Sequence, residues 1–304
     1  MQKKIFLDYI SLNLQEILAP IEDSFFLKLE EIRLRINKPL ILKNNKEYSI
    51  NRLSKVLTDC IEQGYIVTKE DLSKTIELMS NFSLYAFENE LKNGYITIAG
   101  GHRVGISGKT VISGGEVKTI SHISGINIRL SHQVIGCADE IMPYIYPNEV
   151  KHTMIISPPA CGKTTFLRDI IRQLSNIGQT VGLVDERSEI AGAYLGVPQN
   201  DIGIRTDILD GCPKAEGMIM LLRSMAPKVI AVDEIGKKED IHAIDDIISA
   251  GVKIICTVHG KSLEELKKRE VLSEMLEKKV FERYIILGHQ KIQSVYDKNF
   301  EEMS

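Results

Sequence analysis

Apolar and polar positions follow two different patterns along the chain, and the change falls near residue 150. Before it, helical segments surround a strand-like piece at 30–45, and residues 94–121 form short alternating runs separated by Gly-Gly and Ser-Gly pairs. Alternating runs joined by such turns are typical of antiparallel strands. We therefore predict an α+β domain with an antiparallel sheet over residues 1–147.

After residue 150, apolar β-branched runs alternate with helical patterns. The runs TMIIS, TVGLVDE, VIAVDE and VKIICTVHG are separated by helical spacing that begins near Lys163 and covers about 213–226 and 239–250. This alternation indicates an α/β domain with a mainly parallel sheet and crossover helices. RYIILGH and KIQSVYD are expected to add two strands. We place the second domain at 148–304, after a linker at 142–150 that contains two prolines.

Composition and charge limit the class of protein. The 304 residues are 43% apolar and 26% charged with a net charge of -3, as in a soluble protein of two domains, and the acidic balance argues against a nucleic-acid or lipid-surface protein. No run reaches the roughly 18 apolar residues of a membrane span, and the amphipathic N-terminus lacks a signal-peptide core. The five scattered cysteines contain no CxxC pair, so we expect a reducing cytosol and no structural zinc.

The segment SPPACGKTT, residues 157–165, has the form of a phosphate-binding loop between a strand and a helix. Gly162 leaves room for a phosphate at the helix N-terminus, Lys163 supplies charge to the β and γ phosphates, and the Thr164 hydroxyl can bind Mg²⁺. Ser157 replaces the first glycine of the GxxxxGK[ST] pattern, a mild departure at a position that needs a small residue. A chance GKT after a strand is the alternative. The predicted nucleotide-binding residues are Ser157, Pro158, Pro159, Ala160, Cys161, Gly162, Lys163, Thr164 and Thr165.

Two carboxylates end the apolar run VIAVDE at 229–234. Asp233 is expected to hold Mg²⁺ through water, and Glu234 to polarise the water that attacks the γ-phosphate. By itself, Asp-Glu after an apolar run is often a solvated strand end. Together with the loop, it predicts ATP and Mg²⁺ as ligands. Glu234 also favours hydrolysis, because a small-molecule kinase must exclude water and gains nothing from a base aimed at it.

Two further segments follow predicted strands at the edge where parallel sheets bind ligands. DERSEIAG offers Asp185 and Glu186 as further metal candidates, together with Glu189, and TVHG offers Thr257 and His259 to sense the γ-phosphate or position Glu234. A solvated loop is the alternative for both segments.

Arginines are the remaining candidates, because an arginine often neutralises the charge on a transferring phosphoryl group. Arg103 and Arg129 lie in the first domain, and Arg205 and Arg223 in the second. For each of them, a surface ion pair is the alternative.

Several segments resemble a known family. LLRSMAPKVIAVDEIG (221–236), DERSEIAG and CTVHGKS (256–262) are similar to the acidic strand end, the aspartate box and the histidine box of type II and type IV secretion ATPases. LEEIRLRINKPL, GGHRVGISG and ISGINIRL extend the resemblance to the stage III sporulation protein AA family, over residues 29–260. Lys228 departs from the pattern, since secretion ATPases usually carry an acidic residue there.

The resemblance implies a RecA-like ATPase domain and a homo-hexamer in the mother-cell cytoplasm, peripheral to the membrane around the forespore. A membrane partner, stage III sporulation protein AB, would hold it there to energise a secretion-like channel. The resemblance also implies that the first domain covers the nucleotide at a subunit interface, which favours Arg103 and Arg129 over the other arginines. Our prediction is an Mg-ATP-hydrolysing motor with Lys163, Glu234, His259, Arg223, Arg103 and Arg129 as catalytic candidates.

Two other functions remain open at this point. Ring ATPases of this fold also act on DNA or RNA, although the acidic charge and the absence of a basic stripe interleaved with aromatic residues count against that. A nucleotide-gated scaffold with little turnover is the other alternative.

Overall fold

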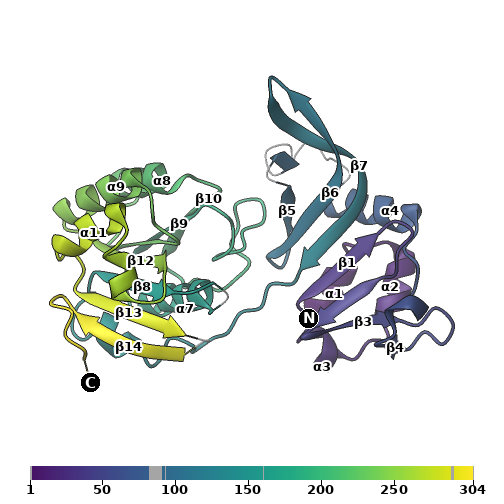
Figure 1. The fold of residues 1–304 in the computed structure, drawn as a ribbon, viewed down its shortest axis with the longest axis horizontal. Coiled ribbons are helices and arrows are strands. Elements are labelled where there is room, and N and C mark those ends of the chain that lie inside the picture. Colours follow the sequence, from purple (N-terminus) through teal and green to yellow (C-terminus); the bar gives the residue numbers. More distant parts are fainter. Residues whose placement is uncertain (1, 82–90, 93, 160, 289–290, 304) are drawn as a thin grey trace. The chain divides into compact units, whose positions relative to one another are not determined.

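The computed structural model describes residues 2–81, 91–92, 94–159, 161–288 and 291–303. The chain divides into two compact units, Met1–His132 and Gln133–Ser304, and each unit contains its own seven-stranded sheet (Figure 1). The expected boundary at 147/148 falls later than this division. The reason is that Ala138, Ile141 and Ile145 are completely buried in the core of the second unit.

The sheet of the first unit has the strand order β4-β3-β2-β1-β7-β6-β5, and all its neighbours pair antiparallel. The meander predicted over 94–121 is made by β5, β6 and the first part of β7, up to Ser121. Beyond Ser107, β6 and the strand that pairs with it form a mostly exposed ribbon that extends past the sheet (Figure 1). The strands are β1 (Glu31–Arg35), β2 (Ile41–Asn44), β3 (Lys46–Ile50), β4 (Leu57–Thr58), β5 (Tyr95–Ile98), β6 (His102–Ser113) and β7 (Glu116–Arg129).

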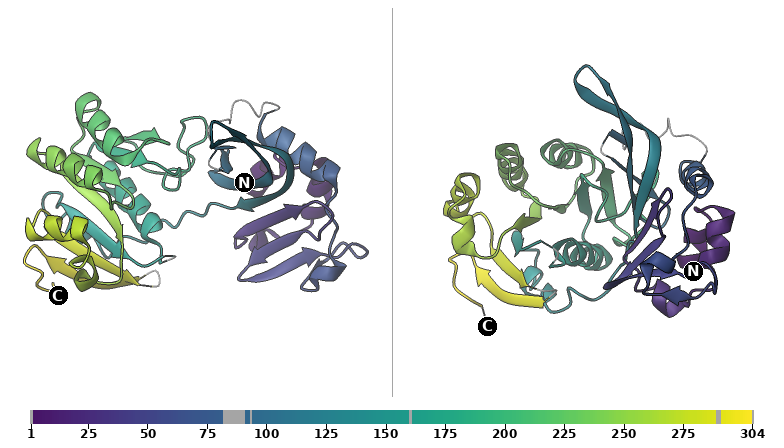
Figure 2. Two further views of the ribbon diagram at one scale, coloured as in Figure 1. Left: turned by 45° about the horizontal axis from the view of Figure 1, so that its top comes forward. Right: turned by 45° about the vertical axis from the view of Figure 1, so that its right-hand side comes forward.

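Short helices accompany this sheet (Figure 2). Helix α2 is capped by Ser11, whose hydroxyl accepts a hydrogen bond from the Leu14 amide. Helix α4 begins with a capping box, in which Thr68 and Asp71 bind each other's backbone N–H groups. The helices are α1 (Gln2–Leu7), α2 (Leu12–Leu18), α3 (Asp23–Phe26) and α4 (Lys69–Met79), with a 3₁₀ turn η1 at Ile61–Gln63.

The sheet of the second unit has the strand order β10-β9-β11-β12-β8-β13-β14. Every neighbouring pair is parallel except the hairpin of β13 and β14. The strands are β8 (Thr153–Ser157), β9 (Val181–Asp185), β10 (Thr206–Asp210), β11 (Val229–Val232), β12 (Lys253–His259), β13 (Arg283–Gly288) and β14 (Lys291–Asp297). The edge strand β10 is absent from the sequence-based prediction, because TDILD is short and contains only two apolar residues.

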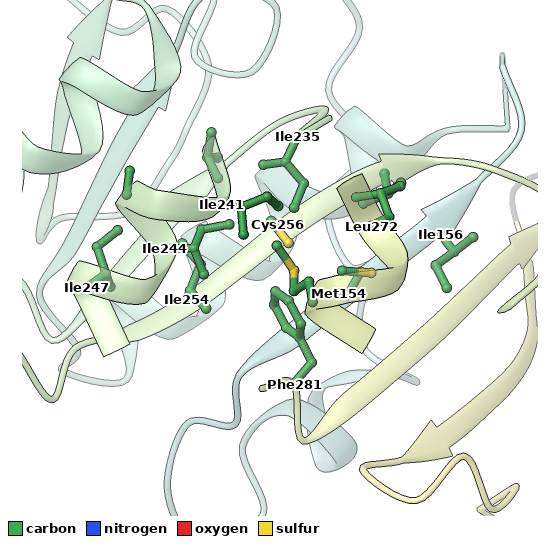
Figure 3. Packing of buried hydrophobic residues seen from close by; sticks show 14 of the residues in the cluster. Met154, Ile156, Ile235, Ile241, Ile244, Ile247, Ile254, Cys256, Leu272 and Phe281 are labelled. Carbon is green, nitrogen blue, oxygen red and sulfur yellow. The ribbon is translucent and has the colours of Figure 1, made fainter. Parts of the chain in front are cut away.

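Helices cover both faces of this second sheet, which explains why β8, β9 and β11 are buried at every position. The core on one face joins Met154, Ile254 and Cys256 to Ile244 of α9 and Leu272 of α11 (Figure 3). The core on the other face packs α6 and α7 against the strand side chains that point to that face of the sheet. The helices are α6 (Met142–Ile145), α7 (Lys163–Asn176), α8 (Lys214–Ser224), α9 (Lys238–Ser249), α10 (Leu263–Leu266) and α11 (Glu270–Glu277).

Among the described residues, no helix has the length and apolar character that crossing a membrane requires.

Candidate functional site

The carboxyl ends of four parallel strands bring the predicted site segments to one edge of the second sheet. The loop at 157–165 follows β8, Asp233 and Glu234 follow β11, and the segment 185–191 follows β9. His259 is the last residue of β12 and is the register partner of Ser157 on β8. Open α/β sheets bind their ligands at this edge.

The phosphate-binding loop leads directly into α7. Gly162 precedes the helix with φ of 89°, a left-handed conformation that glycine adopts without a steric penalty. Ser157 is buried at the end of β8, and its hydroxyl donates to the Pro158 carbonyl at 3.0 Å. A serine therefore fits where the pattern has its first glycine. Cys161 is also buried, and Ala160 lies outside the described residues.

Two contacts join this loop to the end of β11. Lys163 Nζ lies 2.6 Å from Glu234 Oε1, and the Thr164 hydroxyl donates to Asp233 Oδ2 at 3.0 Å. The other oxygen of Asp233 accepts a hydrogen bond from the Thr257 hydroxyl of β12. The structure thus brings together two pairs of residues that the sequence separates by about 70 positions. Thr257, a candidate of the sequence analysis, contacts both Asp233 and the Glu234 amide.

The Thr164 hydroxyl and the Asp233 carboxylate are the hard oxygen donors that Mg²⁺ prefers. In the part of the chain that the structure describes, no group of three or more His, Cys, Asp or Glu side chains is arranged to hold a metal ion. A Mg²⁺ ion that also binds phosphate and water oxygens needs only one or two protein carboxylates. The residues present therefore fit Mg²⁺ bound together with a nucleotide.

The backbone of Glu234 is held in an uncommon conformation. Its φ is 58°, in the left-handed region that non-glycine residues rarely adopt. Its N–H donates to Thr257 Oγ1 at 2.8 Å, and its carbonyl accepts from Lys214 Nζ at 2.9 Å. Such conformations persist where neighbouring contacts hold them, and they cluster at functional sites.

Lys214 is a site residue that the sequence analysis missed. It is the first residue of α8, its side chain is 14% exposed, and its ammonium also pairs with Glu186 at 3.1 Å. A cation in the first turn opposes the helix dipole, so the contacts with Glu186 and the Glu234 carbonyl offset an unfavourable position. Nothing in the local sequence marks this lysine, because its partners are distant along the chain.

The Glu234 carboxylate is surrounded by cations. Partial burial raises its pKa, but the hydrogen bond from Lys163 and the charges of Lys163, Arg187 and Lys214 together lower the pKa below the usual value of a glutamate. Glu234 is therefore an anion at neutral pH. An anionic carboxylate is the form that can accept a proton from water.

Asp185 stabilises its own loop. Its carboxylate accepts three backbone hydrogen bonds, from the N–H groups of Glu189, Ile190 and Ala191, at 2.9–3.0 Å. Burial raises the pKa of Asp185 to about 6, against the lowering effect of the bonds from Ala191 and Glu189. The other metal candidate of this segment, Glu186, pairs with Lys214.

His259 and Arg205 each contact another part of the second unit. His259 accepts a bond at its carbonyl from Arg269, and Arg205 donates to the Ser175 carbonyl. Arg223 lies in the last turn of α8, roughly 13 Å along the helix from Lys214 at 1.5 Å per residue.

The two remaining arginines belong to the first unit and are register partners across β6 and β7. Arg103 stacks over the ring of Tyr95, with its guanidinium carbon 3.6 Å from the ring centroid. Arg129 is largely exposed and lies 3.5 Å from Glu31.

Comparison with solved structures identifies the fold. The chain superposes on the ATPase DotB of Legionella pneumophila with a TM-score of 0.59 and 17% identity, over 91% of this chain and 76% of that one. It superposes on the pilus retraction motor PilT with a TM-score of 0.55 and 14% identity, over 89% of this chain and 77% of that one. The chain therefore shares the fold of these two proteins, with a RecA-like domain and an N-terminal α+β domain, which confirms the predicted fold class.

The sequence comparisons give the family. The model of the family "Sporulation stage III, protein AA" matches residues 1–303. Stage III sporulation protein AA of Bacillus subtilis strain 168 is 42% identical over 297 residues, which cover 94% of this chain and 92% of that protein. The chain belongs to this family, as its motifs suggested. A shorter similarity, 31% over 158 residues, covers 51% of this chain and 46% of the uncharacterized protein ycf45 of Cyanidium caldarium.

Proposed function

We propose that this protein is an Mg-ATP-hydrolysing motor. The observation that carries the proposal is the pair of contacts between the loop and the end of β11, Lys163 with Glu234 and Thr164 with Asp233. These contacts bring a phosphate-binding loop, a set of oxygen donors for a metal ion and an ionised carboxylate to one edge of the sheet. Each is a component that phosphoryl transfer to water requires.

Each residue then has a role that its position supports. Lys163 and the N-terminal amides of α7 bind the phosphates, and Glu234 accepts the proton of the attacking water. Thr164 and Asp233 hold Mg²⁺, which supplies positive charge to the β and γ phosphate oxygens when bound. Thr257 orients the site, because its hydroxyl donates to Asp233 and accepts from the Glu234 amide.

We further propose that the motor serves a secretion-like channel complex at the forespore membrane during sporulation. Its membership in the sporulation family and its secretion-ATPase fold support this role. In this proposal the protein assembles as a homo-hexamer in the mother-cell cytoplasm and binds the membrane through stage III sporulation protein AB. The nucleotide then lies at a subunit interface that the N-terminal unit covers.

The test is phosphate release by the purified protein with ATP, with Mg²⁺ or with EDTA. We expect turnover that requires Mg²⁺, loss of nucleotide binding in Lys163→Ala, and ATP binding with only a low residual rate of turnover in Glu234→Gln. Glu239→Gln is the matched control, because Glu239 is exposed in the first turn of α9. Normal turnover by Glu234→Gln would contradict the assignment of the base.

A concentration series tests the assembly. If the site is completed by a neighbouring subunit, the rate per chain rises as rings form, and the membrane partner shifts that rise to lower concentration. A rate per chain that stays constant over the range in which rings assemble would exclude an interface site.

A further inference from the structure

A second cation lies next to the Glu234 carboxylate. Arg187 Nη1 is 3.3 Å from Glu234 Oε2, while Lys163 Nζ is 2.6 Å from Oε1 of the same carboxylate. One carboxylate therefore binds the phosphate-binding lysine with one oxygen and an arginine with the other. Arg187 is the second residue after β9, inside the segment DERSEIAG, and the sequence analysis did not select it.

The loop that carries Arg187 is held from both sides. The buried Asp185 carboxylate binds the N–H groups of residues 189–191, and the buried Arg168 of α7 donates to the carbonyls of Glu189 and Ile190. Because α7 also carries the phosphate-binding loop at its N-terminus, the Arg187 loop is fixed to the helix that positions the phosphates. Its geometry relative to Lys163 is thus set by buried contacts.

The pair between Arg187 and Glu234 is well suited to exchange partners. The Arg187 side chain is 61% exposed, and an exposed ion pair contributes only about 0–1 kcal/mol, so its loss has a small effect. A γ-phosphoryl group carries more charge than a carboxylate and offers three oxygens. The planar fork of a guanidinium matches that geometry with two parallel hydrogen bonds.

We propose that Arg187 binds the γ-phosphate of ATP from within the same subunit. On ATP binding, Lys163 and Arg187 both transfer from the Glu234 carboxylate to the phosphate, and Glu234 becomes available to the attacking water. Arg187 thereby distinguishes ATP from ADP and stabilises the charge of the transferring group. The inference rests on the proposed function, and it supplies an arginine in cis, distinct from Arg103 and Arg129 of the first unit.

The experiment compares ATP and ADP affinities in the Glu234→Gln background, where bound ATP is hydrolysed only slowly. Titrations of Mg-ATP and Mg-ADP are carried out with Glu234→Gln alone and with Arg187→Gln added. We expect Arg187→Gln to weaken ATP binding by about 10-fold, as for a lost charge-assisted hydrogen bond, and ADP binding by less than about 2-fold. In an otherwise unchanged chain, Arg187→Lys is expected to retain more turnover than Arg187→Gln.

The matched control is Lys278→Gln. Lys278 is another exposed cation of the second unit and pairs with Asp245 and Glu274. We expect Lys278→Gln to leave the ratio of ATP to ADP affinity unchanged. A change in this ratio would mean that any loss of positive charge, and not Arg187 in particular, weakens ATP binding. An equal effect of Arg187→Gln on both nucleotides, or none on ATP, overturns the inference. Failure of the Glu234→Gln parent to bind Mg-ATP contradicts the proposed function itself.

Discussion

Lys163 and Glu234 form an ion pair with 2.6 Å between the lysine nitrogen and a glutamate oxygen. The two residues follow different strands: Lys163 begins the helix after β8, and Glu234 lies after β11. Strand β12 lies between β8 and β11 in the sheet. The pair joins the residue assigned to phosphate binding with the residue assigned to water activation. In the proposed mechanism, binding of phosphate by Lys163 and release of the Glu234 carboxylate are therefore one exchange, which would link substrate binding to formation of the base.

Lys214 is predicted to act through Glu234. Because its ammonium holds the carbonyl of a residue at φ of 58°, Lys214→Met should misorient the carboxylate and lower kcat by roughly 10- to 100-fold, with KM changed by less than about 3-fold. Lys214→Arg should restore part of the rate. Lys238→Met is the control, because Lys238 occupies the same first position of α9 and is exposed.

A double-mutant cycle separates this positioning role from general damage. If Lys214 acts only through Glu234, then adding Lys214→Met to Glu234→Gln should not lower the residual rate further. An additive loss in the double variant would refute the positioning role.

Gly162→Ala is predicted to abolish nucleotide binding. Gly162 has φ of 89° in the phosphate-binding loop, so alanine adds about 1 kcal/mol of backbone strain and a methyl group where the phosphate approaches. Gly178→Ala is the matched control, since Gly178 has φ of 102° at the other end of α7 and open space around the added carbon. The two variants should lose similar unfolding free energy in urea, but only Gly162→Ala should lose ATP binding. Equal nucleotide affinities would show that the loop does not require glycine there.

Arg129 or Arg103 is predicted to complete the site of a neighbouring subunit. If so, Lys163→Ala and Arg129→Ala should each be inactive alone, yet a mixture should regain activity. In a ring assembled from equal amounts, about a quarter of the interfaces combine an intact Lys163 with an intact Arg129. The measurement is phosphate release after co-assembly, repeated with Arg103→Ala. A mixture without activity, from variants that still form mixed rings, would argue against an arginine in trans.

The second unit is predicted to lose stability in mild acid through His152. His152 Nδ1 accepts a hydrogen bond from the Ile254 amide. Burial, and after it the charge of Lys253, lowers the pKa of His152 from 6.5 to about 4, although the charges of Glu282 and Glu149 raise it. The unfolded chain therefore binds more protons than the folded chain between these values. The free energy of unfolding should fall as pH decreases from about 6.5 to about 4.

Glu282 is predicted to lower the free energy of unfolding further at lower pH. Although burial raises its pKa, the bonds from the His152 amide, Lys253 and Lys151 lower it from 4.5 to about 2. Its contribution is present above pH 4.5 and is lost as pH falls toward 2. Urea titrations at a series of pH values, with His152→Gln beside the exposed His242→Gln, check both statements. A His152→Gln variant with an unchanged slope between pH 6.5 and 4 would show that His152 is not responsible.

Local patterns in the sequence were sufficient to predict the RecA-like fold and to select the candidate site residues. Runs of buried β-branched residues spaced by helical segments indicated a covered, mainly parallel sheet. Two groups of residues, each directly after a strand, are local signals of phosphate and metal chemistry: Gly162, Lys163 and Thr164 in one group, and Asp233 and Glu234 in the other. These features depend on residues close together in the chain, so pattern alone exposes them. The second compact unit begins at Gln133, before the predicted boundary at 147/148, and the burial of Ala138 and Ile145 against α7 and the sheet is a tertiary contact that no local pattern shows.

The side chains around Glu234 could be identified only from the folded chain. Lys214 and Arg187 reach it because α8 and the loop after β9 meet at the edge where β11 ends, and Thr257 reaches it from β12. The left-handed conformation of Glu234 and the enclosure of Asp185 by backbone amides likewise follow from contacts between distant segments. The physical reason is that the carboxyl ends of parallel strands lie at one edge of the sheet. Which strand ends are neighbours there depends on the strand order, and no local stretch of the sequence determines that order.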